Sequence, residues 1–227
     1  QANSAEKIEL ISQDWSFKGI TGKFDRASLQ RGYQVYKEVC SGCHSMRLLS
    51  YRNLSEPGGP EFTLQEVKNI ASNAEVTDGP DEQGEMFTRP GRPSDKFVSP
   101  YPNVQAATAA NGGAYPPDMS VLVKSRKGGA DYIYSVLMGY TEPPAGMKLD
   151  DGVYYNKYME GNKIKMSQPL LDDIVSYADG TKATEAQMAK DVTTFMTWAA
   201  EPHLEARHKL GLRVIIFLII LTVLVYF

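Results

Sequence analysis

The chain has 227 residues, of which 42% are hydrophobic and 22% are charged, and its formal net charge at pH 7 is -3. This length can bury a proper core in one or two domains, and the two fractions are ordinary for a globular protein. Because the charge balance is slightly acidic, the composition argues against a nucleic acid or another polyanion as a partner.

Residues 1–15, QANSAEKIELISQDW, contain no initiator methionine, no basic stretch and no apolar signal-peptide core. We interpret them as a mature end from which a leader has been removed. This interpretation predicts an exported protein.

Residues 28–40, SLQRGYQVYKEVC, have the pattern of an amphipathic helix. Apolar side chains recur every three to four residues at Leu29, Tyr33, Tyr36 and Val39 or Cys40. Asp25 or Ser28 is expected to cap the start of this helix. Gly32 lies on or beside the apolar stripe, and a glycine inside a helix costs about 1 kcal/mol relative to alanine. We therefore expect another helix to approach closely at Gly32.

The predicted helix leads directly into the motif C-S-G-C-H, formed by Cys40, Cys43 and His44, and the chain has only these 2 cysteines. C-x-x-C-H is the attachment signature of c-type haem. Two thiols at this spacing can each add to one vinyl group of the same porphyrin, and the adjacent histidine is then placed under the iron as its proximal ligand. A backbone carbonyl commonly orients the second ring nitrogen of such a histidine.

Three other uses of the cysteine pair compete with haem. A thioredoxin-like dithiol requires a strand-to-helix turn, whereas the segment before Cys40 reads as a helix. A zinc site normally takes four ligands, and the remaining histidines, His203 and His208, lie beside the apolar C-terminal segment. A disulfide between Cys40 and Cys43 would close a very small loop. We favour haem and keep these three alternatives open.

An iron with one histidine ligand needs a second axial ligand or keeps an open position. Methionine in that position raises the reduction potential and suits electron transfer. Met188 and Met196 fall on the apolar stripe of a helix and are expected in the core. Among the methionines in loop-like segments, Met166 is the best placed because it precedes the last amphipathic helix, and Met159 and Met147 are the alternatives.

The middle of the chain is rich in loops. Residues 89–120, RPGRPSDKFVSPYPNVQAATAANGGAYPPDMS, contain prolines throughout and a glycine pair, which forbid long regular elements. Such a segment can wrap a flat apolar cofactor. Arg126 then precedes a second glycine pair and a short helix that starts at Asp131. Arginine suits the carboxylates of haem propionates, although a solvated surface arginine explains Arg126 equally well.

An acidic stretch precedes these loops, within VTDGPDEQGE at residues 76–85. Its carboxylates are Asp78, Asp81, Glu82 and Glu85. The stretch is either a solvated loop or a docking rim for a basic partner, which would act mainly on the rate of encounter.

Residues 184–202 predict a second amphipathic helix. Thr184 and Gln187 have the spacing of a capping box, and Pro202 marks the end of the helix. We expect this helix to cross the first one near Gly32. The aromatic contacts expected at the crossing join Phe195 or Trp198 to Tyr33 or Tyr36.

The sequence from Leu210 to Phe227 reads LGLRVIIFLIILTVLVYF, without a charge after Arg213. A membrane-spanning helix needs about 20 mostly apolar residues. We predict one such helix, at the short end of the usual range, with a span that continues beyond the printed sequence. A buried core helix is the alternative, but a run that is apolar on every face has no side for solvent. The chain is thus divided into a haem-binding head, 1–202, and an anchor, 203–227.

Taken together, these segments resemble the cytochrome c1 family, the haem-carrying subunits of ubiquinol–cytochrome c oxidoreductase (the cytochrome bc1 complex). The resemblance covers essentially the whole chain and is carried by VCSGCHSMR, RPGRPSDKF, SPYPNVQAATAANGGAYPPDMS, KSRKGGADYIYSVLMGYTEPP, IKMSQPL and DGTKATEAQMAKDVTTFMTWAAEPHLEARHKLG. C-x-x-C-H alone occurs in many cytochromes c. The YPPD segment, the R-x-G-G-x-D-Y segment and the junction between AAEP and the anchor are far more specific.

The resemblance implies a mostly α fold. This fold is one cytochrome c-like domain with long irregular loops around a single covalent haem c, followed by one C-terminal transmembrane helix. The resemblance also implies attachment at Cys40 and Cys43, with His44 and Met166 as the axial ligands of the iron. Further haem contacts are implied for Asn111, Ala114, Pro117, Arg126 and Tyr132. Of these, Arg126 is expected near a propionate.

The resemblance further implies an electron-transfer subunit of quinol–cytochrome c reductase with no bond chemistry of its own. Such a subunit accepts an electron from the Rieske iron–sulfur protein and passes it to a soluble or anchored cytochrome c. The implied partners also include the cytochrome b subunit and the membrane, in a dimeric complex. A haem enzyme or sensor, such as a membrane-anchored peroxidase with a labile sixth ligand, is the alternative from another class.

The position of the head relative to the membrane also follows from the resemblance. The basic residues before the span, Arg207, Lys209 and Arg213, would by themselves place the head in the cytoplasm. Haem attachment in this family instead implies a bacterial cytoplasmic membrane with the head in the periplasm. The alternative is the mitochondrial inner membrane, with the head in the intermembrane space.

Overall fold

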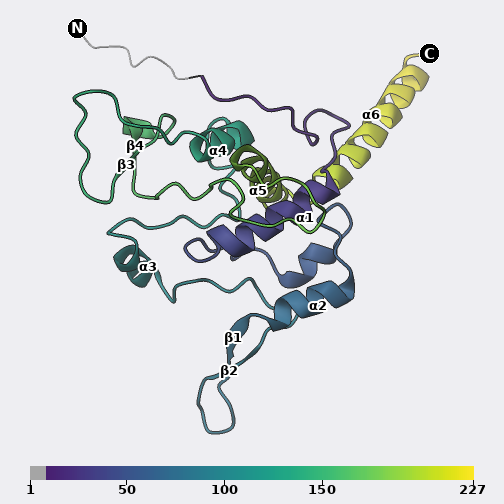
Figure 1. The fold of residues 1–227 in the computed structure, drawn as a ribbon. Helices are drawn as coiled ribbons and strands as arrows, with labels where there is room; N and C mark the ends of the chain where they lie inside the picture. The colour runs from purple at the N-terminus through teal and green to yellow at the C-terminus, as the bar shows by residue number, and fades with distance from the viewer. Residues whose placement is uncertain (1–8) are drawn as a thin grey trace.

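The computed structural model describes residues 9–227. Within these residues the fold is mostly helical, and two small antiparallel sheets of two strands each complete it (Figure 1). A mostly α fold with one long apolar helix at its C-terminus is therefore confirmed. The prediction of a mature N-terminal end falls largely on residues 1–8, which lie outside the described residues.

Among residues 9–227, six α-helices form the framework: α1 (Arg26–Val35), α2 (Leu64–Ser72), α3 (Val104–Ala110), α4 (Gly129–Leu137), α5 (Glu185–Ala200) and α6 (Leu204–Tyr226). Three short turns of other helix types occur: the π-helical turn η1 (Tyr36–Cys40) and the 3₁₀ turns η2 (Tyr51–Ser55) and η3 (Glu160–Asn162). One hairpin pairs β1 (Glu75–Asp78) with β2 (Phe87–Pro90), and another pairs β3 (Tyr154–Tyr155) with β4 (Lys163–Ile164).

Helix α1 and turn η1 together make the helix predicted before the cysteine motif. Asp25 is the cap, because its side chain accepts a hydrogen bond from the backbone of Ala27 at 3.2 Å. Ser28 is instead buried and donates to Asp191 of α5 at 2.5 Å. The last turn widens into a π-helix that ends at Cys40, a distortion often found at functional sites.

Helices α1 and α5 cross at Gly32, as predicted. A Cβ atom added to Gly32 would lie 2.1 Å from the carbonyl oxygen of Asp191 and 2.8 Å from the Cβ atom of Phe195. Only a glycine therefore permits this approach. The ring of Phe195 lies 5.7 Å from that of Tyr33 and 5.9 Å from that of Tyr36, and these aromatic contacts add to the packing.

Helix α5 begins after Thr184, whose hydroxyl accepts a hydrogen bond from the backbone of Gln187 at 3.2 Å. The second half of the predicted capping box, in which the side chain of Gln187 would accept a hydrogen bond from the backbone of Thr184, is wrong. The side chain of Gln187 donates instead to the buried carboxylate of Asp191 at 3.0 Å, one helical turn further on. The helix ends at Ala200, two residues before Pro202, and the predicted core methionines of this helix, Met188 and Met196, are fully buried.

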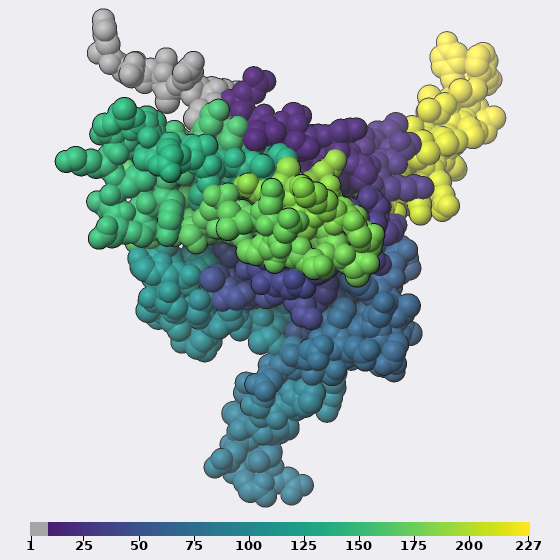
Figure 2. Space-filling model, in the orientation of Figure 1, coloured from purple at the N-terminus to yellow at the C-terminus, as the bar shows by residue number. Residues whose placement is uncertain are grey.

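The loop-rich middle of the chain is confirmed, since α3 is its one helix among the described residues and has only 7 residues. Before it, the hairpin of β1 and β2 projects from the body of the molecule, at the bottom of Figures 1 and 2. The acidic stretch at residues 78–85 forms the end of β1 and the connection to β2. Asp78 and Asp95 both pair with Arg89, while Asp81 accepts hydrogen bonds within its own turn.

Beyond its first turns, helix α6 stands free of the head, in yellow in Figures 1 and 2. It has 23 residues, and its most apolar window has a mean hydropathy of 2.3 and is not buried. At about 1.5 Å per residue, the whole helix is about 35 Å long, against roughly 30 Å for the hydrocarbon core of a bilayer, but its first turns lie against the head. The alternative of a buried core helix is wrong for this segment. The boundary at residues 202 and 203 remains a prediction.

Candidate functional site

The cysteine motif follows the end of η1 as a tight turn. The backbone N–H groups of Cys43 and His44 donate to the carbonyl of Cys40 at 3.1 and 2.9 Å. Both cysteines are free thiols, so the small disulfide considered as an alternative is not formed. Cys40 is half-buried, whereas Cys43 is exposed and lines a cavity of about 330 Å³ beside the start of α3.

His44 is held through its ring and through its backbone. The Nδ1 atom lies 2.8 Å from the carbonyl oxygen of Pro117, and the carbonyl of His44 accepts a hydrogen bond from Tyr36 at 3.3 Å. Because a carbonyl oxygen can only accept, we assign the ring proton to Nδ1, which leaves the lone pair of Nε2 for a metal. Burial lowers the pKa of His44, although the bond to Pro117 and the charge of Asp118 oppose this effect, so the ring is neutral at pH 7.

The segment at residues 115–120 is clamped against the motif by Asp118. Its Oδ2 atom accepts hydrogen bonds from the hydroxyl of Ser45 at 2.8 Å and from the backbone of Arg47 at 3.0 Å. The backbone of Met119 also donates to the carbonyl of Ser45 at 2.8 Å. These bonds set Pro117 at the correct place to orient His44.

Asp118 was not identified from the sequence as a functional residue. Burial disfavours its charged form, but hydrogen bonds from the backbone of Arg47 and from Ser120 outweigh burial and lower the pKa of Asp118 to about 2. The sequence offered one signal, because Asp118 directly follows the proline pair in the YPPD segment.

Asn111 and Ala114 lie in the turn after α3. The side chain of Asn111 donates to the carbonyl of Ala107 at 2.7 Å, and the backbone carbonyl of Asn111 accepts a hydrogen bond from the backbone of Ala114 at 3.1 Å. The ammonium of Lys165 donates to the carbonyl of Gly112 at 2.6 Å. This bond joins Lys165, the residue directly before Met166, to the turn that leads to Pro117.

Met166 follows β4 and is half-buried. Its backbone carbonyl accepts a hydrogen bond from the hydroxyl of Tyr140 at 3.1 Å, which fixes the chain at this point. Met159 is engaged differently, because its sulfur accepts a hydrogen bond from the hydroxyl of Tyr132 at 3.4 Å. Met147 is half-buried in the loop between α4 and β3. Of the three candidates, Met166 thus lies in a segment that is bonded to Tyr140 directly and to the turn after α3 through the neighbouring Lys165.

Arg126 lies just before α4, and Tyr132 lies in the first turn of this helix. Arg126 is exposed and contacts only Ser125, at 3.1 Å to its hydroxyl, among the polar contacts of the described residues. Gly128 has a φ of 96°, which a side chain would disfavour, and this lets the chain turn into α4. Tyr132 is half-buried and packs against the main hydrophobic core. Among the described residues the guanidinium of Arg126 thus bonds only to its neighbour Ser125, through Nη1, and its other donors remain for an anionic group.

The donor set fits a covalent haem better than the remaining alternatives. The described residues contain no group of three or more His, Cys, Asp or Glu side chains that could hold a metal ion, which argues against zinc. A redox dithiol needs a thiol with a lowered pKa, but burial, followed by the nearby Cys43, raises the pKa of Cys40 to about 12. Free thiols at this spacing and a neutral imidazole with one nitrogen available are what haem attachment requires.

Comparison with known proteins bears directly on this site. The model of the Cytochrome C1 family matches residues 15–227. The mitochondrial cytochrome c1 heme protein of Schizosaccharomyces pombe is 52% identical over 219 residues, which cover 96% of this chain and 70% of that protein. The cytochrome c1 of Rhodospirillum rubrum is 48% identical over 98% of this chain and 86% of its own length. A protein called cytochrome b/c1 from Bradyrhizobium diazoefficiens is 50% identical over 94% of this chain, which spans 34% of that longer protein.

Proposed function

The chain belongs to the cytochrome c1 family, and we propose that it binds a single haem c through Cys40 and Cys43, with His44 and Met166 as the axial ligands of the iron. It is a haem-carrying electron-transfer subunit of quinol–cytochrome c reductase, the cytochrome bc1 complex, and α6 anchors it in the membrane. The observation that supports the ligand assignment most strongly is the 2.8 Å contact between His44 Nδ1 and Pro117, which leaves Nε2 available.

The bound haem supplies one-electron chemistry at its iron. The chain supplies the environment. The carbonyl of Pro117 fixes the tautomer and orientation of His44, and Asp118 holds Pro117 in place. A thioether ligand at Met166 favours the reduced iron and so raises the potential. The exposed guanidinium of Arg126 is suited to offset the charge of a propionate.

We propose that the head accepts its electron from the Rieske iron–sulfur protein, beside the cytochrome b subunit, and passes it to a cytochrome c. The complex is proposed to be a dimer, with the head in the periplasm or in the mitochondrial intermembrane space. Relatives of similar identity come from bacteria and from mitochondria, which supports either compartment. The exposed acidic tip at residues 81–85 supports a basic partner that is steered by charge.

A potentiometric titration of the haem-loaded protein, with its visible spectrum, tests the ligand assignment. We expect a sharp reduced α-band and a high potential in the native protein. Met166→Leu should lower the potential by about 100 mV or more, because each tenfold loss in the relative stability of the reduced form lowers a one-electron potential by about 59 mV. Met159→Leu is the matched control and should leave the potential close to native, because its sulfur is bonded to Tyr132.

Other outcomes would redirect the assignment. A native potential in Met166→Leu with a drop in Met159→Leu would move the distal ligand to Met159. A native high-spin ferric form that binds cyanide readily would favour the haem enzyme or sensor. The absence of any covalent haem band would return the cysteines to the zinc or dithiol alternatives.

A further inference from the structure

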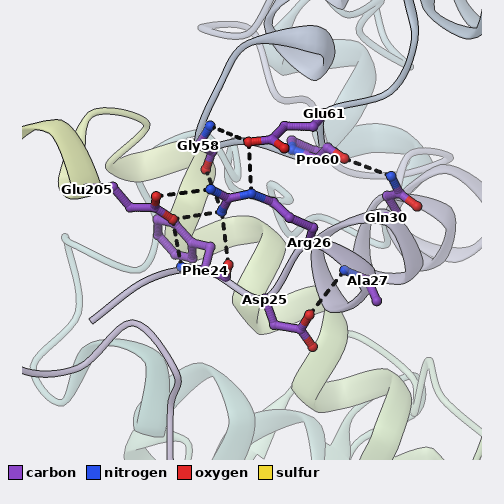
Figure 3. Close-up of polar contacts among 9 residues, drawn as sticks. All are labelled: Phe24, Asp25, Arg26, Ala27, Gln30, Gly58, Pro60, Glu61 and Glu205. Carbon is purple, nitrogen blue, oxygen red and sulfur yellow. Dashed lines mark hydrogen bonds and ion pairs between the residues drawn. The ribbon is translucent and has the colours of Figure 1, made fainter. Parts of the chain in front are cut away.

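The first turns of α6 are bonded to the head by a buried carboxylate. Glu205 is only 7% exposed. Its Oε1 atom accepts hydrogen bonds from Arg26 Nη1 at 2.7 Å and from the backbone of Phe24 at 3.0 Å, and its Oε2 atom accepts from Arg26 Nη2 at 3.0 Å (Figure 3). Two parallel bonds between a guanidinium and a carboxylate fix the relative rotation of the two groups as well as their separation.

Arg26 is the first residue of α1, and its guanidinium joins three parts of the chain. Besides Glu205, its Nε atom donates to Glu61 at 2.9 Å, and Nη1 also donates to the carbonyls of Phe24 at 2.9 Å and Gly58 at 3.3 Å (Figure 3). The anchor, the start of α1 and the loop before α2 therefore meet at one side chain. Of these contacts, only those to Glu205 connect the anchor.

Two further polar contacts lie on the same short stretch of α6. Arg207 pairs with Glu201, which also pairs with Lys124 in the head, and Nδ1 of His208 lies 3.3 Å from the carbonyl oxygen of Gly22. Residues 212–226 of α6 are all exposed, and within the part of the chain that the structure describes they form no polar contact with the head. The head and the anchor are thus joined through the first two turns of α6.

The same contacts lead directly to the cysteine motif. Helix α1 continues into η1, which ends at Cys40, so one helical path of about 21 Å, at roughly 1.5 Å per residue, joins Arg26 to the first thiol. Helix α5 supports this path at Gly32 and is itself joined to α6 by only three residues, 201–203. A rotation at the junction would therefore be transmitted to the haem attachment site.

We infer that Arg26 and Glu205 are positioning residues that fix the orientation of the haem relative to the membrane anchor. The inference rests on the proposed haem attachment. In a membrane-anchored electron carrier, this orientation decides which edge of the haem is presented to partners in the plane of the membrane. A buried carboxylate paired with a half-buried guanidinium suits this role, because any rotation that separates them leaves the carboxylate of Glu205 buried without its charged partner.

The test is electron paramagnetic resonance of the ferric haem in the full chain, reconstituted into stacked, oriented phospholipid bilayers. The signal is recorded as the angle between the membrane normal and the magnetic field is changed. The native protein should show a strong dependence on this angle. Glu205→Gln keeps the size of the side chain but removes the charge, and its signal should depend on the angle at most half as strongly.

Glu61→Gln is the matched control. It also removes a carboxylate from Arg26, but Glu61 belongs to the head and not to the anchor. Its angular dependence should equal that of the native protein, and the visible spectrum and potential should be native in both variants. Native angular dependence in Glu205→Gln, or an equal loss in Glu61→Gln, would overturn the inference. A failure of haem attachment in the native chain would instead contradict the proposed function.

A second readout does not depend on haem. Amide hydrogen exchange at residues 204–209 should be faster in Glu205→Gln than in Glu61→Gln, because the first turns of α6 lose their partner on the head. Equal exchange rates would contradict the inference. If the Glu205→Gln protein does not accumulate, the Arg26→Lys variant is tested in its place. Lysine keeps the positive charge but lacks the two parallel N–H donors of the guanidinium. A native angular dependence in Arg26→Lys would likewise overturn the inference.

Discussion

At the scale of single residues, Asp118 joins the two segments that surround His44. Its pKa of about 2 lies below the value of about 3.9 of an unfolded aspartate, because hydrogen bonds from Arg47 and Ser120 outweigh the effect of burial. A carboxylate whose pKa is lowered by folding stabilises the protein above pH 4, and this contribution is lost as the pH falls from about 4 towards 2.

Asp118→Asn should therefore lower the free energy of unfolding by about 1–2 kcal/mol at pH 7, since one pKa unit corresponds to about 1.4 kcal/mol. The difference from the native protein should shrink as the pH falls below about 4 and vanish near 2. Denaturant titrations of the haem-loaded protein across this range measure both effects. Asp151→Asn, at an exposed position, should change stability by less than about 0.5 kcal/mol. A constant deficit at every pH would show that the charge of Asp118 is not what stabilises the clamp.

The ligand motif and its surroundings differ in how far they could be predicted. The cysteine spacing predicts the role of His44 because the chemistry lies within five consecutive residues. Asp118 and Tyr140 act through segments 73 and 26 residues away along the chain, and no local pattern records such pairs. Only the folded backbone brings them to their partners.

At the scale of elements, the crossing of α1 and α5 depends on Gly32. Gly32→Ala gains about 1 kcal/mol in helix propensity but places a Cβ atom 2.1 Å from a carbonyl oxygen of α5. Both contacting groups are helical backbone or buried side chain, so the helices must separate. We expect a net loss of about 2 kcal/mol or more, seen as a fall in Tm of roughly 4–8 °C.

Gly211→Ala is the matched control for this prediction. It lies inside α6, where an added Cβ atom meets nothing within 4 Å. The same substitution should there leave Tm unchanged or raise it, by up to about 1 kcal/mol of stability. A fall in Tm at Gly211 as large as at Gly32 would mean that steric conflict with α5 is not the cause.

The sequence predicted α1 and α5 well because each carries a long apolar stripe with the helical period. It did not predict the hairpin of β1 and β2, because each strand has only four residues and none of them is fully buried. It also did not predict the π-helical turn before Cys40, because hydrophobic spacing over five residues does not distinguish this turn from an α-helix. Both features depend on contacts outside the element itself.

At the scale of the whole molecule, the head and the anchor were separable from the sequence, since an uncharged run after Arg213 is visible in composition alone. The contacts at the junction between the head and the anchor could not be predicted from the sequence. Glu205 reads as an ordinary surface charge at the start of a helix, and its burial follows only from the return of Arg26 and Phe24 to the same place. The polar first turns of α6 therefore belong structurally to the head, although they are part of the anchor helix.

Two truncated chains test this division. A chain that ends at Lys209 keeps Glu205, whereas one that ends at Pro202 loses Glu205 and the buried Leu204. Both lack the exposed apolar surface of α6 and should be soluble without detergent. The shorter chain should be less stable in urea by about 2 kcal/mol. Removing one partner of a fully buried ion pair costs roughly 3–5 kcal/mol, but Arg26 is only half-buried and still pairs with Glu61. The longer chain with Glu205→Gln should have a stability in urea between those of the two truncated chains. If both chains unfold at the same urea concentration, the first turns of α6 contribute nothing to the head and belong to the membrane segment alone.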